Sequence, residues 1–198
     1  MTVEMLLIRH AAHGDLGKIL TGRTTGVPLT AAGREQAKAL AAKLGDTDLA
    51  AIHSSPAWRA LETAAILAAP TARQVRPGAA LDEIDFGEWT GRDYAALDDD
   101  PEWREWNANR AAATARGGES MISVLARLRG FMTGALERYC GRTIALVTHC
   151  DIIRTLVIDI LGLTANAVHR LEVAPASLTR IRYSRHGGTL ISLNEQPA

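Results

Sequence analysis

The sequence has few cysteines, few aromatic residues and no excess of charge of either sign. Two cysteines in 198 residues cannot build a disulfide framework, so we expect reduced thiols and a cytoplasmic location. Lysine plus arginine and aspartate plus glutamate both number 22, and this balance argues against nucleic acid as an electrostatic partner. We find no apolar run long enough to span a membrane and no signal-peptide pattern, so we expect no membrane partner.

The length and composition are typical of one globular domain. Hydrophobic residues make up 47% of the chain and charged residues 22%, which are ordinary values for a globular protein. A chain of 198 residues can bury a substantial core but is short for two full domains. We therefore expect a single domain over residues 1–198. The composition leaves the oligomeric state open.

Apolar runs and amphipathic stretches alternate along the chain. The apolar runs predict strands at 3–8, 49–55, 143–148, 170–175, 177–184 and 189–194, the last two joined by a turn. The amphipathic stretches predict helices at 29–44, 55–69, 117–139 and 150–163. Thr30 is the expected N-cap of the first helix, and Ser55 with Pro56 is expected to begin the second. This order predicts an α/β fold whose mostly parallel central sheet has helices on both faces and an antiparallel extension.

The segment between the second and third long helices is irregular. It mixes acids, tryptophans and turn residues, and it predicts short helices at about 93–98 and 101–112. We expect residues of about 84–118 to form a small helical cap over one edge of the sheet. Trp89, Trp103 and Trp106 indicate that this cap is ordered, mainly through packing.

Histidine and arginine side chains follow the ends of the predicted strands. Arg9 and His10 come directly after the first apolar run, and His149 follows the run at 143–148. Arg59 lies about one turn into the helix that follows the second strand. Parallel neighbours would bring these side chains together at the carboxyl edge of the sheet, where α/β proteins bind ligands. Two guanidinium groups and two imidazoles at one point predict an anion site.

A nucleotide-binding loop is not supported by the glycine-rich stretch GDLGKILTGRTTG at 14–26. The glycine spacing before Lys18 is wrong for a P-loop, and Ile19 stands where a hydroxyl would bind Mg²⁺. No metal-ligand spacing occurs in the chain either. We therefore expect neither a metal nor a cofactor.

Six motifs make the chain similar to the histidine phosphatase superfamily, the phosphoglycerate mutase-like proteins, over nearly the whole sequence. They are LLIRHAAHG, LTGRTTGVPLTAAGREQAKAL, SSPAWRALETA, LDEIDFGEWTG, GGES and LVTHCDIIR. Each motif alone is a weak signal, and their shared order makes the signal specific. The chain departs from the usual pattern at Ala11 and Cys150, where the family mostly has glycine.

This resemblance implies a phosphoglycerate mutase-like fold and assigns roles to the residues at the strand ends. His10 would be the nucleophile that forms a phosphohistidine, while Arg9, Arg59 and His149 hold the phosphoryl oxygens. Glu83 would protonate the leaving oxygen and later take a proton from the attacking water. His149 thus counts as a catalytic residue beside His10 and Glu83.

The resemblance also marks residues whose roles stay open. Thr21 and Gly22 lie where the family often places loop donors to the phosphate, although Thr21 also fits a plain turn residue. Asp82, Asp85 and Glu88 are rivals of Glu83 as the acid, and His13 lies near the expected phosphate pocket. Cys150 is expected to be an inert small side chain. The remaining histidines, which we expect to be structural or at the surface, are His53, His169 and His186.

The implied function is hydrolysis of a phosphomonoester on a small phosphorylated metabolite. Phosphoglycerate mutase is the alternative, and a non-catalytic phosphate-binding module is a third. Cofactor-dependent mutases carry a longer middle segment with further basic residues, whereas this one is short and contains the acidic run DDDPE at 98–102. The sequence therefore favours a phosphatase and leaves its substrate open.

Overall fold

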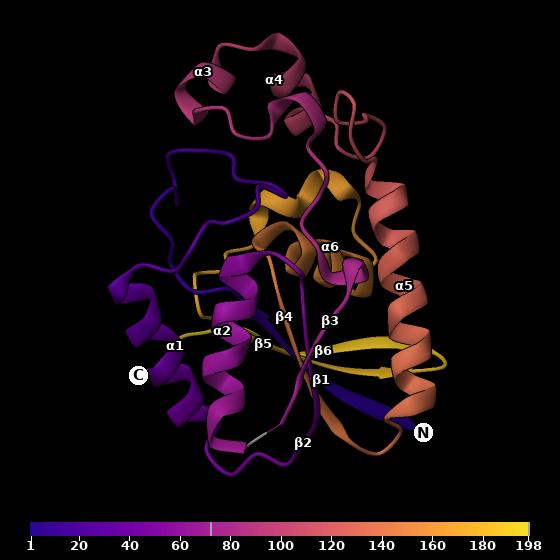
Figure 1. Cartoon of the computed structure of the whole chain (residues 1–198). Helices are drawn as coiled ribbons and strands as arrows, with labels where there is room; N and C mark the ends of the chain where they lie inside the picture. Colours follow the sequence, from indigo (N-terminus) through magenta and orange to yellow (C-terminus); the bar gives the residue numbers. More distant parts are fainter. Residues whose placement is uncertain (72, 198) are drawn as a thin grey trace.

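The computed structural model describes residues 1–71 and 73–197, and a six-stranded sheet lies at its centre (Figure 1). The strand order is β3-β2-β4-β1-β5-β6. The strands are β1 (Thr2–Arg9), β2 (Leu49–Ser54), β3 (Val75–Pro77), β4 (Thr143–Thr148), β5 (Leu178–Ser184) and β6 (Gly187–Glu195). The pairs β1–β4, β2–β4 and β2–β3 are parallel, whereas β5 and β6 extend the sheet in antiparallel pairs. This topology confirms the predicted mostly parallel sheet with its antiparallel extension.

Helices cover both faces of the sheet. The helices α1 (Ala31–Leu44) and α2 (Trp58–Ala68) pack on one face, and α5 (Met121–Arg138) and α6 (Cys150–Ile160) pack on the other (Figure 1). Successive side chains of a strand point to opposite faces, so Leu6 and Ile8 pack with the first pair and Met5 and Leu7 with the second. Within the described ranges, no helix combines the length and apolar character that crossing a membrane requires.

Two short helices, α3 (Tyr94–Asp98) and α4 (Pro101–Ala108), lie over the carboxyl end of the parallel strands (Figure 1). Both were predicted, although α4 ends four residues before the predicted boundary at 112. Trp89, Trp103 and Trp106 are buried and pack against one another and against Phe86. The expected packing role of the tryptophans is thus confirmed. Short 3-10 helices complete the structure: η1 (Ala69–Thr71), η2 (Ala79–Leu81), η3 (Gly87–Trp89) and η4 (Ala165–Arg170).

The strand predicted at 170–175 is wrong. Residues 165–170 form η4, and the chain then crosses the end of β1 to a corner at Ala176, whose φ is 56°. The backbone of this segment forms hydrogen bonds with side chains instead of a neighbouring strand: Val173 O accepts from Arg9 Nη1 at 2.6 Å, and Ala174 N donates to Asn194 Oδ1 at 2.7 Å. The segment therefore lies beside strand ends without pairing as a strand, with Val173 buried and its other apolar residues partly buried.

The start of one helix and one short edge strand also differ from the sequence prediction. Thr30 caps α1 as expected, accepting from Gly33 N at 3.0 Å. The second helix, however, begins at Trp58, because Ser55 and Pro56 lie in the preceding loop. Ser55 is engaged elsewhere, since its hydroxyl donates to Asp82 Oδ1 at 3.0 Å. The three-residue edge strand β3 was not predicted, because its sequence Val-Arg-Pro contains no apolar run.

Candidate active site

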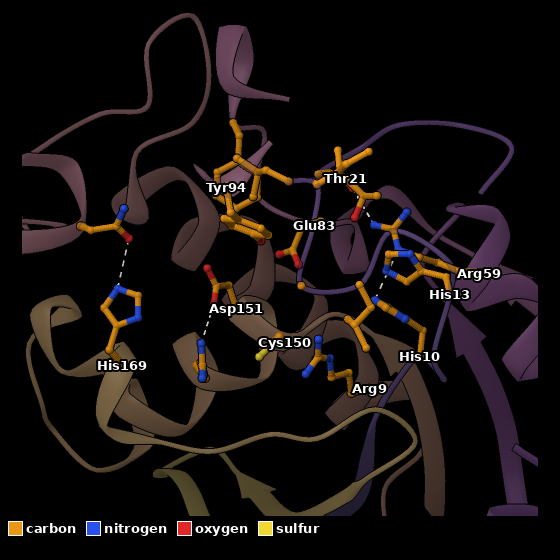
Figure 2. Close-up of a pocket in the computed structure, with 18 of the residues that line it drawn as sticks. Arg9, His10, His13, Thr21, Arg59, Glu83, Tyr94, Cys150, Asp151 and His169 are labelled. Atoms are coloured by element: carbon orange, nitrogen blue, oxygen red, sulfur yellow. Dashed lines mark hydrogen bonds and ion pairs between the residues drawn. The ribbon is translucent and has the colours of Figure 1, made fainter. Parts of the chain in front are cut away.

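The two histidines predicted to meet lie next to each other at the carboxyl edge of the sheet. Parallel pairing places Arg9 opposite Thr148, and His10 N donates to Thr148 O at 2.9 Å. The ring centroids of His10 and His149 are 5.1 Å apart. Arg59, in the first turn of α2, joins them: its Nε lies 3.3 Å from His10 Nε2 and its Nη2 lies 3.2 Å from His149 Nδ1. The structure therefore brings these predicted residues together, and Figure 2 shows Arg9, His10 and Arg59 among them.

The hydrogen bonds of His10 define its tautomer. Nδ1 lies 2.9 Å from the carbonyl oxygen of Ala11, which can only accept, so Nδ1 carries the proton. Nε2 receives the Nε–H of Arg59 and therefore keeps its lone pair. Burial, followed by His149, Arg59 and Arg9, holds the pKa of His10 well below its usual 6.5. The ring is thus neutral, with its lone pair on Nε2.

His149 is held by a relay of hydrogen bonds. Its Nδ1 accepts from Arg59, and its Nε2 lies 2.8 Å from Ser55 Oγ, which donates to Asp82. Burial, and then Arg59, outweigh the nearby carboxylate of Asp82, whose Oδ1 lies 3.6 Å from His149 Nε2, and lower the pKa of His149 to about 4. Burial alone would raise the pKa of Asp82, but the nearby His149 ring and the hydrogen bond from Ser55 lower it. Asp82 therefore stays ionised and orients His149.

A cavity borders His10, and three buried nitrogens at its His10 end have no hydrogen-bond partner among residues 1–71 and 73–197. They are Arg9 Nε, Arg59 Nη1 and His13 Nδ1. Arg59 is only 1% exposed, and burying an N–H group without an acceptor is costly. The His13 ring lies 5.3 Å from that of His10, so it borders the same space. These groups form the phosphate end of the cavity, which offers donors to an anion.

The loop before α1 fixes Arg59. Thr21 and Gly22 both line the cavity, and Gly22 O accepts from Arg59 Nη2 at 2.6 Å. Gly22 has a φ of 46°, and a Cβ there would come within 3.0 Å of Thr90 Oγ1. Glycine at this position thus allows the close approach that orients the guanidinium group. Thr21 lies beside it on the wall of the cavity.

Glu83 is the acid of the 82–88 stretch that lines the cavity in the described structure. Asp82 is bound to Ser55, and Asp85 and Glu88 form ion pairs with arginines outside the cavity. The structure therefore shows which of the four acids borders the cavity, a choice that the sequence left open.

The position of Glu83 is fixed by its backbone. Its carbonyl oxygen accepts from Arg23 Nε at 2.9 Å and from Arg127 Nη2 at 3.2 Å. The side chain points toward the histidines, with Oε2 4.0 Å from His149 Nδ1. Burial, followed by the nearby carboxylate of Asp151, raises the pKa of Glu83 to about 7. A carboxyl with this pKa can both give and take a proton near neutral pH.

A second polar cluster lines the same cavity, which has a volume of about 430 Å³. We call it the distal end; its residues are Tyr94, Asn107, Arg110, Asp151, Arg154 and His169. Asp151 accepts from Arg110 Nη1 at 2.7 Å and from Arg154 Nη1 at 3.2 Å. Burial alone would raise the pKa of Asp151, but Arg110 and then Arg154 lower it to about 2. This end was not predicted from the sequence. His169 is exposed at the surface, as expected, and it also borders the cavity.

Cys150 borders the cavity. Burial raises the pKa of its thiol to about 11, and Sγ donates to Val173 O at 3.6 Å. In the part of the chain that the structure describes, no three histidine, cysteine, aspartate or glutamate side chains are arranged to hold a metal ion.

The chain belongs to the histidine phosphatase superfamily (branch 1), because the model of that family matches residues 5–196. Phosphoserine phosphatase 1 of Hydrogenobacter thermophilus is 29% identical over 197 residues, which cover 97% of this chain and 92% of that protein. A probable phosphoglycerate mutase, GpmB of Yersinia enterocolitica, is 28% identical over 186 residues, covering 91% and 85%.

The fold is also that of solved relatives. The native structure of a mycobacterial glucosyl-3-phosphoglycerate phosphatase has a TM-score of 0.88 at 27% identity, covering 99% of this chain and 100% of that one. The predicted family and fold are therefore confirmed.

Proposed function

We propose that this protein is a phosphomonoesterase that hydrolyses a small phosphorylated metabolite through a phosphohistidine at His10. One observation carries the proposal: His10 Nε2 is unprotonated and faces Arg59, and Glu83, whose pKa is raised to about 7, lines the same cavity. Nucleophile, anion holders and proton donor thus meet at one point. The phosphatase names of two relatives agree with this chemistry.

In the first step, the phosphoryl group lies beside Arg9 and Arg59, whose N–H groups bind its oxygens and stabilise the charge of the transition state. His149 lies behind them and orients Arg59, whose Nη2 is 3.2 Å from its Nδ1. His10 Nε2 attacks phosphorus as the bond to the ester oxygen breaks, and Glu83 gives its proton to that oxygen. The alcohol leaves, and the phosphoryl group stays on His10.

In the second step, water attacks the phosphohistidine. Glu83, now a carboxylate, takes a proton from the water, and the N–P bond breaks as phosphate forms. His10 Nε2 regains its lone pair, and Glu83 is protonated again for the next cycle. Thr21 and Gly22 form the loop that borders the phosphate during both steps.

A mutase remains the second candidate, because one relative carries that name. A mutase that keeps a bisphosphate intermediate needs cations for a second phosphoryl group. Here the cap arginines Arg92, Arg110 and Arg116 are paired with carboxylates at 2.7, 2.7 and 3.0 Å. This pairing favours the phosphatase. A non-catalytic binding module ranks last, because it would not need both His10 and a protonated Glu83.

Cellular setting and domain organisation complete the proposal. The free thiols of Cys140 and Cys150 and the balanced charge support a cytoplasmic enzyme without a nucleic-acid partner. We further propose one domain over residues 1–198, with residues of about 84–118 as its cap.

Hydrolysis of 4-nitrophenyl phosphate tests the proposal directly. The wild type should release phosphate without added metal, and His10→Ala should lose at least a thousandfold in kcat. His186→Ala is the matched control, because His186 lies exposed in the β5–β6 turn, and it should keep wild-type activity. Loss of activity in neither variant, or in both, would contradict the assignment of His10.

A further inference from the structure

The cavity has two ends with different chemistry. His10, Arg9 and Arg59 lie at the phosphate end, whereas Tyr94, Asp151 and His169 lie on the other side of the cavity (Figure 2). A volume of about 430 Å³ falls in the range of cavities that hold small molecules, so a bound phosphoryl group leaves space for its alcohol part. The distal end is therefore placed to contact the leaving group.

The charges of the distal end do not balance. Arg110 and Arg154 contribute two positive charges, and Asp151, which both arginines contact, contributes one negative charge. Burial, and then Arg110, lower the pKa of His169, so this ring is neutral and adds no charge. One positive charge is left beside the cavity when Glu83 is protonated, the state that the first step of the proposed reaction requires.

Arg110 also has an unused donor. Its side chain is 3% exposed, stacks over the Trp106 ring at 3.9 Å and donates to Asp151 and Asn107. Its Nε is buried without a partner within residues 1–71 and 73–197. Tyr94 adds a hydroxyl that stays protonated, because burial raises its pKa to about 12. These are donors, and an acceptor with one negative charge would satisfy them.

We propose that the distal end binds a carboxylate, so that the preferred substrates are small phosphomonoesters whose alcohol part carries a carboxylate group. A carboxylate is a planar monoanion that accepts from guanidinium N–H groups and tyrosine hydroxyls. A second phosphoryl group would bring about two negative charges against one uncompensated positive charge. This inference rests on the proposed function, because it assigns the leaving-group side of that same site.

A matched substrate pair isolates the carboxylate. 3-Phosphoglycerate and glycerol 3-phosphate differ only in whether the terminal carbon is a carboxylate or a hydroxymethyl group. We expect kcat/KM to be about tenfold or more higher for 3-phosphoglycerate, the usual effect of a hydrogen bond to a charged group. Equal values, or a preference for glycerol 3-phosphate, would overturn the inference.

Variants of Arg154 separate charge from structure. Arg154→Gln should lower the ratio of kcat/KM for 3-phosphoglycerate to kcat/KM for glycerol 3-phosphate about tenfold. Arg154→Lys keeps the charge and should retain most of this ratio. Arg129→Gln is the matched control: it also removes an arginine paired with an aspartate, but its side chain is 63% exposed and outside the cavity. The control should leave the preference unchanged. A preference that persists in Arg154→Gln would overturn the role of the distal charge.

Binding measurements distinguish this inference from the proposed function. Calorimetry on His10→Ala compares the Kd of the same two compounds without turnover, and 3-phosphoglycerate should bind about tenfold more tightly. If the wild type hydrolyses no phosphate ester, the proposed function is wrong, and the Kd ratio still decides the distal site. If 4-nitrophenyl phosphate is hydrolysed but the two Kd values are equal, the carboxylate site is wrong and the proposed function stands.

Discussion

Replacing Glu83 by glutamine tests the assignment of the proton donor. The substitution keeps the shape of a side chain that is buried beside His149 but removes its transferable proton. With a pKa of about 7, the carboxyl group is about half protonated at neutral pH and can serve as acid in one step and base in the next. General acid catalysis contributes about a hundredfold to ten-thousandfold, or about 3–5 kcal/mol of transition-state stabilisation.

The effect of Glu83→Gln should depend on the leaving group. An alkyl alkoxide is a poor leaving group and needs the proton, whereas nitrophenolate leaves without it. We expect kcat/KM to fall about a hundredfold or more with glycerol 3-phosphate, and about tenfold or less with 4-nitrophenyl phosphate. Because Glu83 is also the base of the second step, the aryl substrate should give a burst followed by slow turnover.

Steady-state and rapid-quench assays on both substrates measure this difference. Glu88→Gln is the matched control, because Glu88 lies in the same stretch but forms an exposed ion pair with Arg116 at 3.0 Å. It should behave as the wild type. Equal losses on both substrates without a burst would mean that Glu83 only positions the substrate. A leaving-group-selective loss in Asp82→Asn or Asp85→Asn would move the acid to that residue.

Three further predictions follow from the pKa shifts and the hydrogen bonds of the site. Since Glu83 must be protonated in the first step, kcat/KM for an alkyl phosphate should fall about tenfold per pH unit above about pH 7; a flat profile to pH 9 would contradict this role. Asp82→Asn should lower kcat about tenfold with little change in KM, because His149 loses the carboxylate that orients it through Ser55; an effect on KM alone would refute the relay. Iodoacetamide at pH 7 should label the exposed Cys140 and leave Cys150 unmodified, as mass spectrometry of the peptides would show, because burial raises the pKa of Cys150 to about 11.

The parts of the fold that the sequence predicted correctly depend on local patterns. The apolar run 143–148 indicates a buried strand, and Thr30 before an Ala-rich helix is a clear N-cap. Residues 170–175 were assigned to a strand on a weaker pattern, yet they lie beside strand ends without pairing as a strand, and only Val173 among them is buried. An apolar pattern in the sequence does not say which groups form hydrogen bonds with the backbone, and for this reason the strand predicted at 170–175 was wrong.

The phosphate end of the site could be predicted because parallel strands fix its geometry. Once the strands ending at His10 and His149 are neighbours, their imidazoles must meet, and Arg59 follows from its place in the first turn of α2. The distal end could be predicted only in part. Asp151 and Arg154 lie three residues apart on α6, directly after His149, and this spacing places them on one helix face near the site.

The cap residues of the distal end gave no such signal. Tyr94 and Arg110 come from an irregular segment whose path over the sheet is set by tertiary packing of the tryptophans. His169 reaches the cavity from η4, in a region that the sequence assigned to a strand boundary. Choosing Glu83 among four nearby acids likewise required the structure, because adjacent residues of a loop have no fixed periodicity.

The position of the phosphoryl group in the phosphoenzyme shows whether His10 is the nucleophile. A rapid alkaline quench during turnover of 4-nitrophenyl phosphate, followed by peptide mass spectrometry and phosphorus NMR, locates the phosphoryl group. We expect a base-stable, acid-labile adduct on Nε2 of His10, because Nδ1 of this ring donates to Ala11 O. Phosphate on His149, on Cys150 or on a serine, or continued turnover by His10→Ala, would contradict this assignment.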